Sequence, residues 1–164
     1  MNVKWITPAV TAMDKDGHVD LEANFRLYDF LIEKGMDGIL LLGSIGEFFA
    51  VPREEKRLLI REAVSYINRR VTVYVGTNEM EFPACVELSN YAVAQGADGA
   101  MVISPYYFSL PDSAVLNFYD RLAERMEGDL LLYNFPDRTG YDLGPDLIYS
   151  LAMRHRNIVG IKDT

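Results

Sequence analysis

The stretch Gly35-Met36-Asp37-Gly38, followed by the apolar run Ile39-Leu40-Leu41-Leu42, has a second copy in Gly96-Ala97-Asp98-Gly99 and Ala100-Met101-Val102-Ile103. The copies begin at positions 35 and 96 and therefore lie 61 residues apart. This distance fits two strand-helix units of roughly 30 residues each. In both copies a glycine is placed to end a helix, and the Gly-x-Asp-Gly turn leads into a short buried strand. The repeat therefore predicts regular alternation of helices and strands.

The rest of the chain fits this alternation. Asp20 is placed to cap the first helix, and Pro52 to open the second. Apolar runs of strand length between amphipathic stretches predict a parallel sheet covered by helices. The expected strands span residues 3–6, 39–42, 71–75, 100–103, a segment that begins with 130–132, and 158–161. The expected helices span residues 21–34, 52–67, 83–95, 113–126 and 145–154.

Composition narrows the classes of function. The chain has 164 residues, is 49% hydrophobic and carries a net charge of -8, which suits one domain with a real core. The negative charge argues against a nucleic-acid partner or an anionic membrane surface, since both need clustered Lys and Arg. No apolar run approaches the ~20 residues of a membrane span. The single Cys85 cannot form an internal disulfide, so we expect a reducing, cytoplasmic setting.

The last stretch, residues 157–164, places a lysine at the end of an expected strand. Ile158-Val159-Gly160-Ile161 reads as a strand buried on both faces, and it runs directly into Lys162. Burial disfavours the ammonium form, so an amine held there would have a lowered pKa and could act as a nucleophile. The alternative is that Lys162 simply reaches into solvent.

Other chemically useful groups follow the other expected strands. In parallel α/β proteins such groups meet beyond the carboxyl ends of the strands. Tyr133 and Lys162 are 29 positions apart, which is one strand-helix unit, so they should stand at the ends of adjacent strands. The segments at the strand ends are Thr7-Pro8, Gly43-Ser44-Ile45-Gly46-Glu47, Gly76-Thr77-Asn78, Ser104-Pro105-Tyr106-Tyr107, Tyr133-Asn134-Phe135-Pro136 and Lys162-Asp163-Thr164.

Each of these groups also has an interpretation without chemistry. The loop at 43–47 is either a tight turn or a set of backbone N–H groups that binds a small anion. Tyr133 is either a core aromatic or a reactive phenol, and Tyr107 could pack in an interface. Arg138 lies on a surface loop or clamps a carboxylate. The two histidines, His18 and His155, lack metal-ligand spacing, so we expect no metal site.

The ordered set of strand-end motifs resembles the dihydrodipicolinate synthase and N-acetylneuraminate lyase family over essentially the whole chain. This resemblance implies a (β/α)8, or TIM, barrel that is usually a tetramer. It also implies an imine between a lysine and pyruvate or another 2-oxo acid, with no separate cofactor. The motifs are Thr7-Pro8, Gly43-Ser44-Ile45-Gly46-Glu47, Pro105-Tyr106-Tyr107, Tyr133-Asn134-Phe135-Pro136, Arg138-Thr139-Gly140 and Gly160-Ile161-Lys162-Asp163.

The resemblance also implies catalytic roles for four residues. Lys162 would form the Schiff base, and Tyr133 would relay protons to and from the reacting carbon. Ser44 would link Tyr133 to a second tyrosine, Tyr107, which the synthase branch donates across a dimer interface. A protonated imine withdraws electrons from neighbouring carbons, which permits enamine formation or C–C cleavage.

The substrate-binding roles implied by the resemblance fall to three residues. Backbone N–H groups of Ser44 and Ile45 would hold the pyruvate carboxylate. Arg138 matches the arginine that holds the carboxylate of the aldehyde substrate in the synthase. Ile45 stands where relatives often carry a second threonine, so one side-chain donor for the carboxylate is missing. These residues define the reaction class better than the substrate.

The predicted barrel is incomplete. We count six strands and five helices, whereas a barrel of this type needs eight strands and typically ~250 residues. We therefore expect residues 1–164 to form a single domain that is the N-terminal part of such an enzyme, a truncation, a proteolytic product or an interrupted gene. Its first and sixth strands would have unpaired edges through which the chain could pair or aggregate.

The expected function is that of a Schiff-base lyase or aldolase that resembles 4-hydroxy-tetrahydrodipicolinate synthase. Cleavage of 2-keto-3-deoxy sugar acids or N-acetylneuraminate is the alternative within this class. A non-catalytic half-barrel that keeps the family residues without a finished pocket is the alternative from another class.

Overall fold

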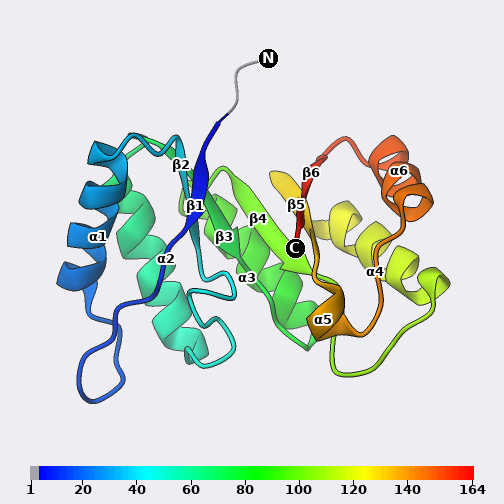
Figure 1. Ribbon diagram of the computed structural model, residues 1–164, viewed down its shortest axis with the longest axis horizontal. Coiled ribbons are helices and arrows are strands. Elements are labelled where there is room, and N and C mark those ends of the chain that lie inside the picture. Colours follow the sequence, from blue (N-terminus) through cyan, green and yellow to red (C-terminus); the bar gives the residue numbers. More distant parts are fainter. Residues whose placement is uncertain (1–3) are drawn as a thin grey trace.

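The computed structural model describes residues 4–164 as one curved sheet with helices packed on it (Figure 1). All six strands are parallel and pair in chain order, β1-β2-β3-β4-β5-β6. Within the described residues β1 and β6 pair on one side only, so the sheet is an incomplete barrel, as predicted. The strands are β1 Ile6–Pro8, β2 Gly38–Leu41, β3 Thr72–Gly76, β4 Gly99–Ile103, β5 Asp129–Asn134 and β6 Ile158–Asp163.

Helices connect the strands and cover the sheet. Figure 1 shows α1 and α2 beside the first strands, and α4 and α6 beside the last. The Asp20 carboxylate accepts a hydrogen bond from the Ala23 N–H at 2.9 Å, which confirms the predicted cap. The helices are α1 Leu21–Glu33, α2 Arg53–Ile67, α3 Phe82–Ala94, α4 Asp112–Arg125, α5 Pro136–Thr139 and α6 Pro145–Arg154.

The repeated Gly-x-Asp-Gly turn joins each helix to two strands. The Asp37 carboxylate accepts a hydrogen bond from the Trp5 N–H at 2.8 Å, and Asp98 accepts one from the Val73 N–H at 2.8 Å. Each aspartate also donates its own backbone N–H to the carbonyl of the same partner. Asp37 donates to Trp5 and Asp98 donates to Val73, at 2.9 Å in each case. Each aspartate therefore ties the start of the strand that follows it to the neighbouring strand. Asp37 binds Trp5, just before β1, and Asp98 binds Val73, within β3.

Two predicted element assignments are wrong. The first strand was expected at residues 3–6, of which Val3 lies outside the described residues, but β1 spans Ile6–Pro8. The ladder begins where Ile6 pairs with Gly38, because Trp5 is already bonded to the Asp37 turn. In addition, the helix count is six within residues 4–164, since the short α5, missing from the expected five helices, follows β5.

The sixth strand is not buried on both faces, contrary to the prediction. Ile158 is buried, but Val159 and Ile161 are 48% and 37% exposed. The physical reason is that β6 lies at an edge of the described sheet, where one flank has no neighbour. The apolar composition of β6 is therefore typical of an inner strand, although β6 lies at the edge of the described sheet.

The buried side chains form two clusters. One lies around β2 and β3 with α1 and α2, and the other lies between β4, β5, α4 and α6. Cys85 is fully buried in the second cluster, and burial raises the pKa of its thiol to about 11, so it is a packing residue. Over the part of the chain that the structure describes, no helix has the length and apolar character needed to cross a membrane.

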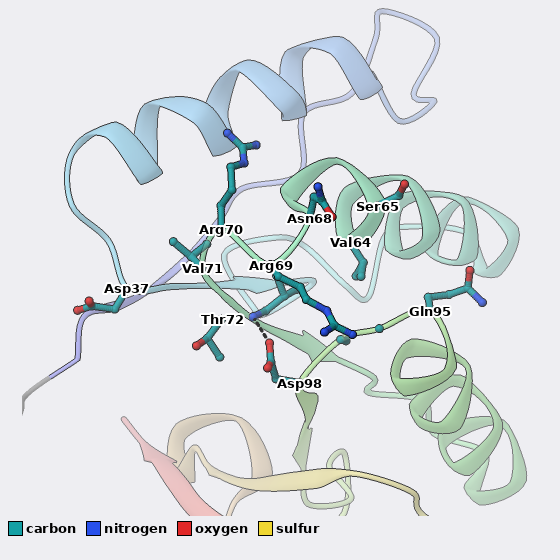
Figure 2. A pocket seen from close by; sticks show the side chains of 13 residues that line it. Asp37, Val64, Ser65, Asn68, Arg69, Arg70, Val71, Thr72, Gln95 and Asp98 are labelled. Carbon is teal, nitrogen blue, oxygen red and sulfur yellow. Dashed lines mark hydrogen bonds between the residues drawn. The ribbon is translucent and has the colours of Figure 1, made fainter.

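A cavity of about 760 Å³ opens at the amino ends of the strands, away from the segments singled out above (Figure 2). Its lining comes from the turns before β2, β3 and β4, including Asp37, Arg69 and Asp98. The two carboxylates are occupied by backbone N–H groups, as described for the repeat. None of the predicted site residues lines this cavity, so its size does not mark the reactive centre.

A buried ion pair near the other end of the sheet gives a stability prediction. Lys56 is 5% exposed, and its Nζ donates a hydrogen bond to the Glu79 carboxylate at 2.7 Å. Glu79→Gln should lower the free energy of unfolding by about 3 kcal/mol, because it leaves a buried cation without a counter-charge. Lys56→Met should cost less than half as much, since it removes that cation. Urea unfolding followed by circular dichroism measures both, and equal losses would contradict the argument.

Candidate functional site

The carboxyl ends of β2, β5 and β6 bring three of the predicted residues together. Ser44 lies just beyond β2, and its Oγ is 3.2 Å from the hydroxyl of Tyr133 in β5. Tyr133 pairs with Lys162 across the β5-β6 ladder, as the 29-residue spacing predicted. In a parallel ladder paired residues project from the same face, so a hydroxyl, a phenol and an amine meet at one point.

The lysine amine contacts the face of the phenol ring. Lys162 Nζ lies 3.9 Å from the centroid of the Tyr133 ring and 6.0 Å from that of Phe135. It donates a hydrogen bond to Thr164 Oγ1 at 2.6 Å, and the residue is half-buried. The expectation that the amine lies away from bulk water is therefore met only in part. The reason is the open flank of β6, which leaves one side of the amine accessible.

The phenol itself is enclosed. Tyr133 is 1% exposed, and its ring packs against Phe135 with 5.6 Å between centroids. Its hydroxyl faces Ser44, whereas the amine lies over its ring. The Tyr133 ring is thus part of the core, while its hydroxyl is hydrogen-bonded to Ser44. The interpretation as a core aromatic and the interpretation as a reactive phenol are therefore compatible.

The loop between β2 and α2 forms a tight turn. The Glu47 N–H donates to the Ser44 carbonyl at 3.1 Å, while Leu42 and Glu47 both adopt a positive φ, 51° and 52°. Within residues 4–164 the N–H groups of Ser44 and Ile45 have no hydrogen-bond acceptor. The Ile45 side chain is 55% exposed. The turn therefore leaves two backbone donors free at the carboxyl end of the sheet.

A small cavity of about 180 Å³ lies beside this turn. Arg138, on α5, stands at its edge with its guanidinium 5.7 Å from the Phe135 ring centroid. Burial, reinforced by the negative charge of Glu79, raises the pKa of Tyr106, so this phenol stays protonated. The cavity is therefore mainly apolar with one cation and two hydroxyls. Its lining residues are Ser44, Phe48, Phe49, Ile103, Tyr106, Phe135 and Arg138.

Tyr107 is not brought into the group. It is 81% exposed, it has a φ of 83°, and its ring packs on the neighbouring Phe108 with 4.8 Å between centroids. Tyr107 does not line the small cavity. Tyr107 and Phe108 thus form an exposed aromatic pair outside the group of Ser44, Tyr133 and Lys162.

Asn134 follows Tyr133 in β5 and was not among the predicted site residues. It is 6% exposed, and its amide donates hydrogen bonds to Asp142 Oδ1 at 2.6 Å and Asp163 Oδ1 at 2.8 Å. Its Oδ1 accepts a hydrogen bond from the Leu143 N–H at 3.0 Å. The available sequence signal was a polar residue directly after Tyr133 in a buried strand.

The described residues, 4–164, contain no group of three or more His, Cys, Asp or Glu side chains that could hold a metal ion. His155 instead contacts Asp120 at 2.7 Å, and His18 contacts Glu55 at 3.3 Å.

Six parallel strands with intervening helices, and a lysine beside a tyrosine at their carboxyl ends, define a barrel-type α/β protein with an amine-centred site. The particular family follows from comparison with known sequences. The chain belongs to the dihydrodipicolinate synthetase family, whose model matches residues 2–164.

Three relatives illustrate the range of the family. YagE of Escherichia coli K12, provisionally named a 2-dehydro-3-deoxy-D-gluconate aldolase, is 40% identical over 159 residues, which cover 97% of this chain and 53% of YagE. The crystal structure of YagE with pyruvate superposes with a TM-score of 0.94 at 39% identity, over 98% of this chain and 54% of that one. The 4-hydroxy-tetrahydrodipicolinate synthase of Methanococcus vannielii is 34% identical over 96% of this chain and 55% of its own.

The structure of the dihydrodipicolinate synthase of Acinetobacter baumannii, complexed with pyruvate, gives a TM-score of 0.93 at 37% identity. That match covers 98% of this chain and 55% of the other. The chain thus spans about half the length of the relatives it matches.

Proposed function

We propose that the chain is the part of a Schiff-base-forming lyase or aldolase that carries the reactive lysine, and that it acts on pyruvate or another 2-oxo acid. The observation that carries this proposal is the juxtaposition of Lys162 Nζ, the Tyr133 phenol and Ser44 Oγ at the carboxyl ends of three strands. Two relatives have solved structures in complex with pyruvate, which supports the same substrate class here.

The proposed reaction begins at the lysine. The unprotonated amine of Lys162 attacks the ketone carbon, the resulting carbinolamine takes up a proton and loses water, and a protonated imine forms. This cation withdraws electrons from the adjacent carbon, which loses a proton and becomes the nucleophilic carbon of an enamine. Tyr133, bonded to Ser44, is placed to transfer these protons. The imine itself is the electron sink, so the proposed chemistry requires no cofactor or metal.

The carboxylates of the substrates need positive partners. In our proposal the free N–H groups of Ser44 and Ile45 hold the carboxylate of the 2-oxo acid. Where the second substrate is an aspartate-derived aldehyde, Arg138, which lines the small cavity, binds its carboxylate. Tyr107 would act in the site of another subunit, in keeping with its 81% exposure.

The proposed assembly completes the barrel. Residues 1–164 would form a single structural unit, equivalent to the first six strand-helix units of an eight-unit barrel, and the open edges of β1 and β6 would be covered in the functional assembly. We infer a homo-oligomer, with pairing through these edges as the alternative. The lone buried Cys85 supports a cytoplasmic location.

A second candidate concerns the other substrate. YagE and YjhH of E. coli, both named as 2-dehydro-3-deoxy sugar acid aldolases, are 40% and 39% identical to this chain, against 38% and 34% for the synthases of Methanoculleus marisnigri and M. vannielii. This small difference makes cleavage of 2-keto-3-deoxy sugar acids the second candidate beside condensation with an aspartate-derived aldehyde. Nuclear magnetic resonance of the products distinguishes the two reactions. Release of pyruvate from 2-dehydro-3-deoxy-D-gluconate supports the aldolase. Loss of pyruvate only when aspartate semialdehyde is added supports the synthase.

The imine is tested by trapping. Incubation with pyruvate and borohydride should add to the protein the mass of pyruvate, less one water and plus two hydrogens. Peptide mapping should place this increment on Lys162 and on none of the other four lysines. The absence of an increment at saturating pyruvate would favour the non-catalytic half-barrel.

Removing one hydroxyl tests the proton relay. Tyr133→Phe should slow exchange of the pyruvate methyl hydrogens for deuterium by about 10²–10³-fold, because enamine formation loses its acid-base group while the ring remains in place. Tyr149→Phe, at a tyrosine that is 67% exposed on α6, is the matched control and should leave the rate unchanged. Deuterium exchange is read by nuclear magnetic resonance, and equal rates in the two variants would remove Tyr133 from the mechanism.

A further inference from the structure

We propose that Asn134 is a positioning residue that fixes the reactive lysine relative to the tyrosine. Its side chain joins three segments: β5 itself, the end of β6 through Asp163, and the loop after α5 through Asp142 and Leu143. The catalytic part of this inference rests on the proposed imine chemistry. The part that concerns how Asn134 holds β6 rests on geometry alone.

The pairing between β5 and β6 places Asn134 directly behind the reactive pair. Tyr133 pairs with Lys162, and Asn134 pairs with Asp163. Because successive residues of a strand project to opposite faces, the Tyr133–Lys162 pair lies on one face and the Asn134–Asp163 pair on the other. The 2.8 Å hydrogen bond from Asn134 to Asp163 therefore ties the two strands together one residue beyond the reactive pair.

The strand that carries Lys162 needs such a tie. The β5-β6 register shifts between Leu130 and Leu131, which pair with Ile158 and Gly160, so Val159 is an extra residue in β6. A slip of one residue would turn the lysine to the opposite face of the sheet. In addition, β6 lies at the edge of the described sheet, where no second neighbour fixes its position.

The same amide also fastens the loop that follows Arg138. Asp142 accepts the 2.6 Å bond, and the Leu143 N–H donates the 3.0 Å bond. The orientation of the amide is determined by its partners, since both carboxylates need donors and the N–H needs an acceptor. One buried side chain therefore sets the positions of the lysine strand and of the loop that follows α5, the helix that carries Arg138.

The polarity of the network provides the test. Asn134→Asp places a third carboxylate against Asp142 and Asp163, so both donor bonds become repulsive contacts. In the triple variant N134D/D142N/D163N, the amides introduced at positions 142 and 163 can donate to the carboxylate introduced at position 134, so these two bonds form again with donor and acceptor exchanged, while the Leu143 N–H donates to residue 134 throughout. Asn90→Asp is the control, because Asn90 also joins two segments, through Arg125 and Glu127, but lies on α3 outside the site.

Two measurements separate this inference from the proposed function. The first is the rate of borohydride trapping with pyruvate, which should fall about a hundredfold in Asn134→Asp, recover to within a few-fold in the triple variant, and stay unchanged in Asn90→Asp. The second is amide hydrogen exchange of residues 158–164, which should quicken in Asn134→Asp and return to the original rate in the triple variant.

Each outcome has one meaning for Asn134. Unchanged trapping and exchange in Asn134→Asp would overturn the inference, as would a triple variant that stays as impaired as the single one. If the unmodified chain traps no pyruvate, the proposed function fails. The exchange measurement then still decides whether Asn134 fastens β6, and the trapping result decides nothing about it.

Discussion

Lys162→Ala should reduce the pyruvate increment after borohydride treatment to the level seen without pyruvate. The side chain supplies the only lysine amine that contacts the Tyr133 ring within residues 4–164, with 3.9 Å between Nζ and the ring centroid. Without that nitrogen no imine can form at the strand ends, and neither the phenol nor Ser44 can replace it as a nucleophile toward a ketone. Intact-protein mass spectrometry measures the increment directly.

Controls for this experiment come from the same chain. Lys15→Ala removes a lysine whose side chain is 87% exposed and should leave the increment at its original size. Lys162→Arg keeps the charge above the Tyr133 ring but removes the amine, so it should abolish the increment and preserve the fold. A full increment in Lys162→Ala would show that another amine reacts, and the assignment of the site would then be wrong.

The positions of the site residues at the strand ends could be predicted from the sequence better than the burial of those residues or their side-chain partners. The spacing of Tyr133 and Lys162 predicted their adjacency, because one strand-helix unit separates neighbouring strands of a parallel sheet, and the structure confirms the pairing. Ser44 follows β2, which is not a neighbour of β5, and its link to Tyr133 was implied by the family resemblance and not by spacing. Positions at strand ends are thus fixed by the periodicity of the chain, which is a local property of the sequence.

Burial and side-chain partners could not be predicted in this way. Ile161 and Val159 have the composition of an inner strand, but their exposure depends on which elements lie beside β6. The partners of Asn134 come from the loop after α5, a helix of four residues whose position no periodic pattern indicates. Tyr107, singled out by its motif, is 81% exposed and has a positive φ, a conformation that no periodic pattern indicates.

Gly99→Ala should be the most destabilising of the substitutions at the repeated turn. A Cβ atom at Gly99 would lie 2.3 Å from the Asp129 carbonyl oxygen and 2.9 Å from its carbonyl carbon. Both are backbone atoms of β5, the strand paired with Gly99, so no side chain can move aside. β4 and β5 would have to separate, and we expect the free energy of unfolding to fall by about 3 kcal/mol or more.

The matched control is Gly144→Ala, at a glycine with a φ of -61° and nothing within 4 Å of the added atom. Gly144 caps α6, so its replacement should cost only a fraction of a kcal/mol to about 1 kcal/mol. Urea midpoints for both variants, followed by circular dichroism, give the comparison. If Gly99→Ala unfolds at the same urea concentration as Gly144→Ala, the strands around the second copy of the repeat do not approach as closely as the geometry requires. In that case the close packing of β4 on β5, which sets the register leading to Tyr133, would need another explanation.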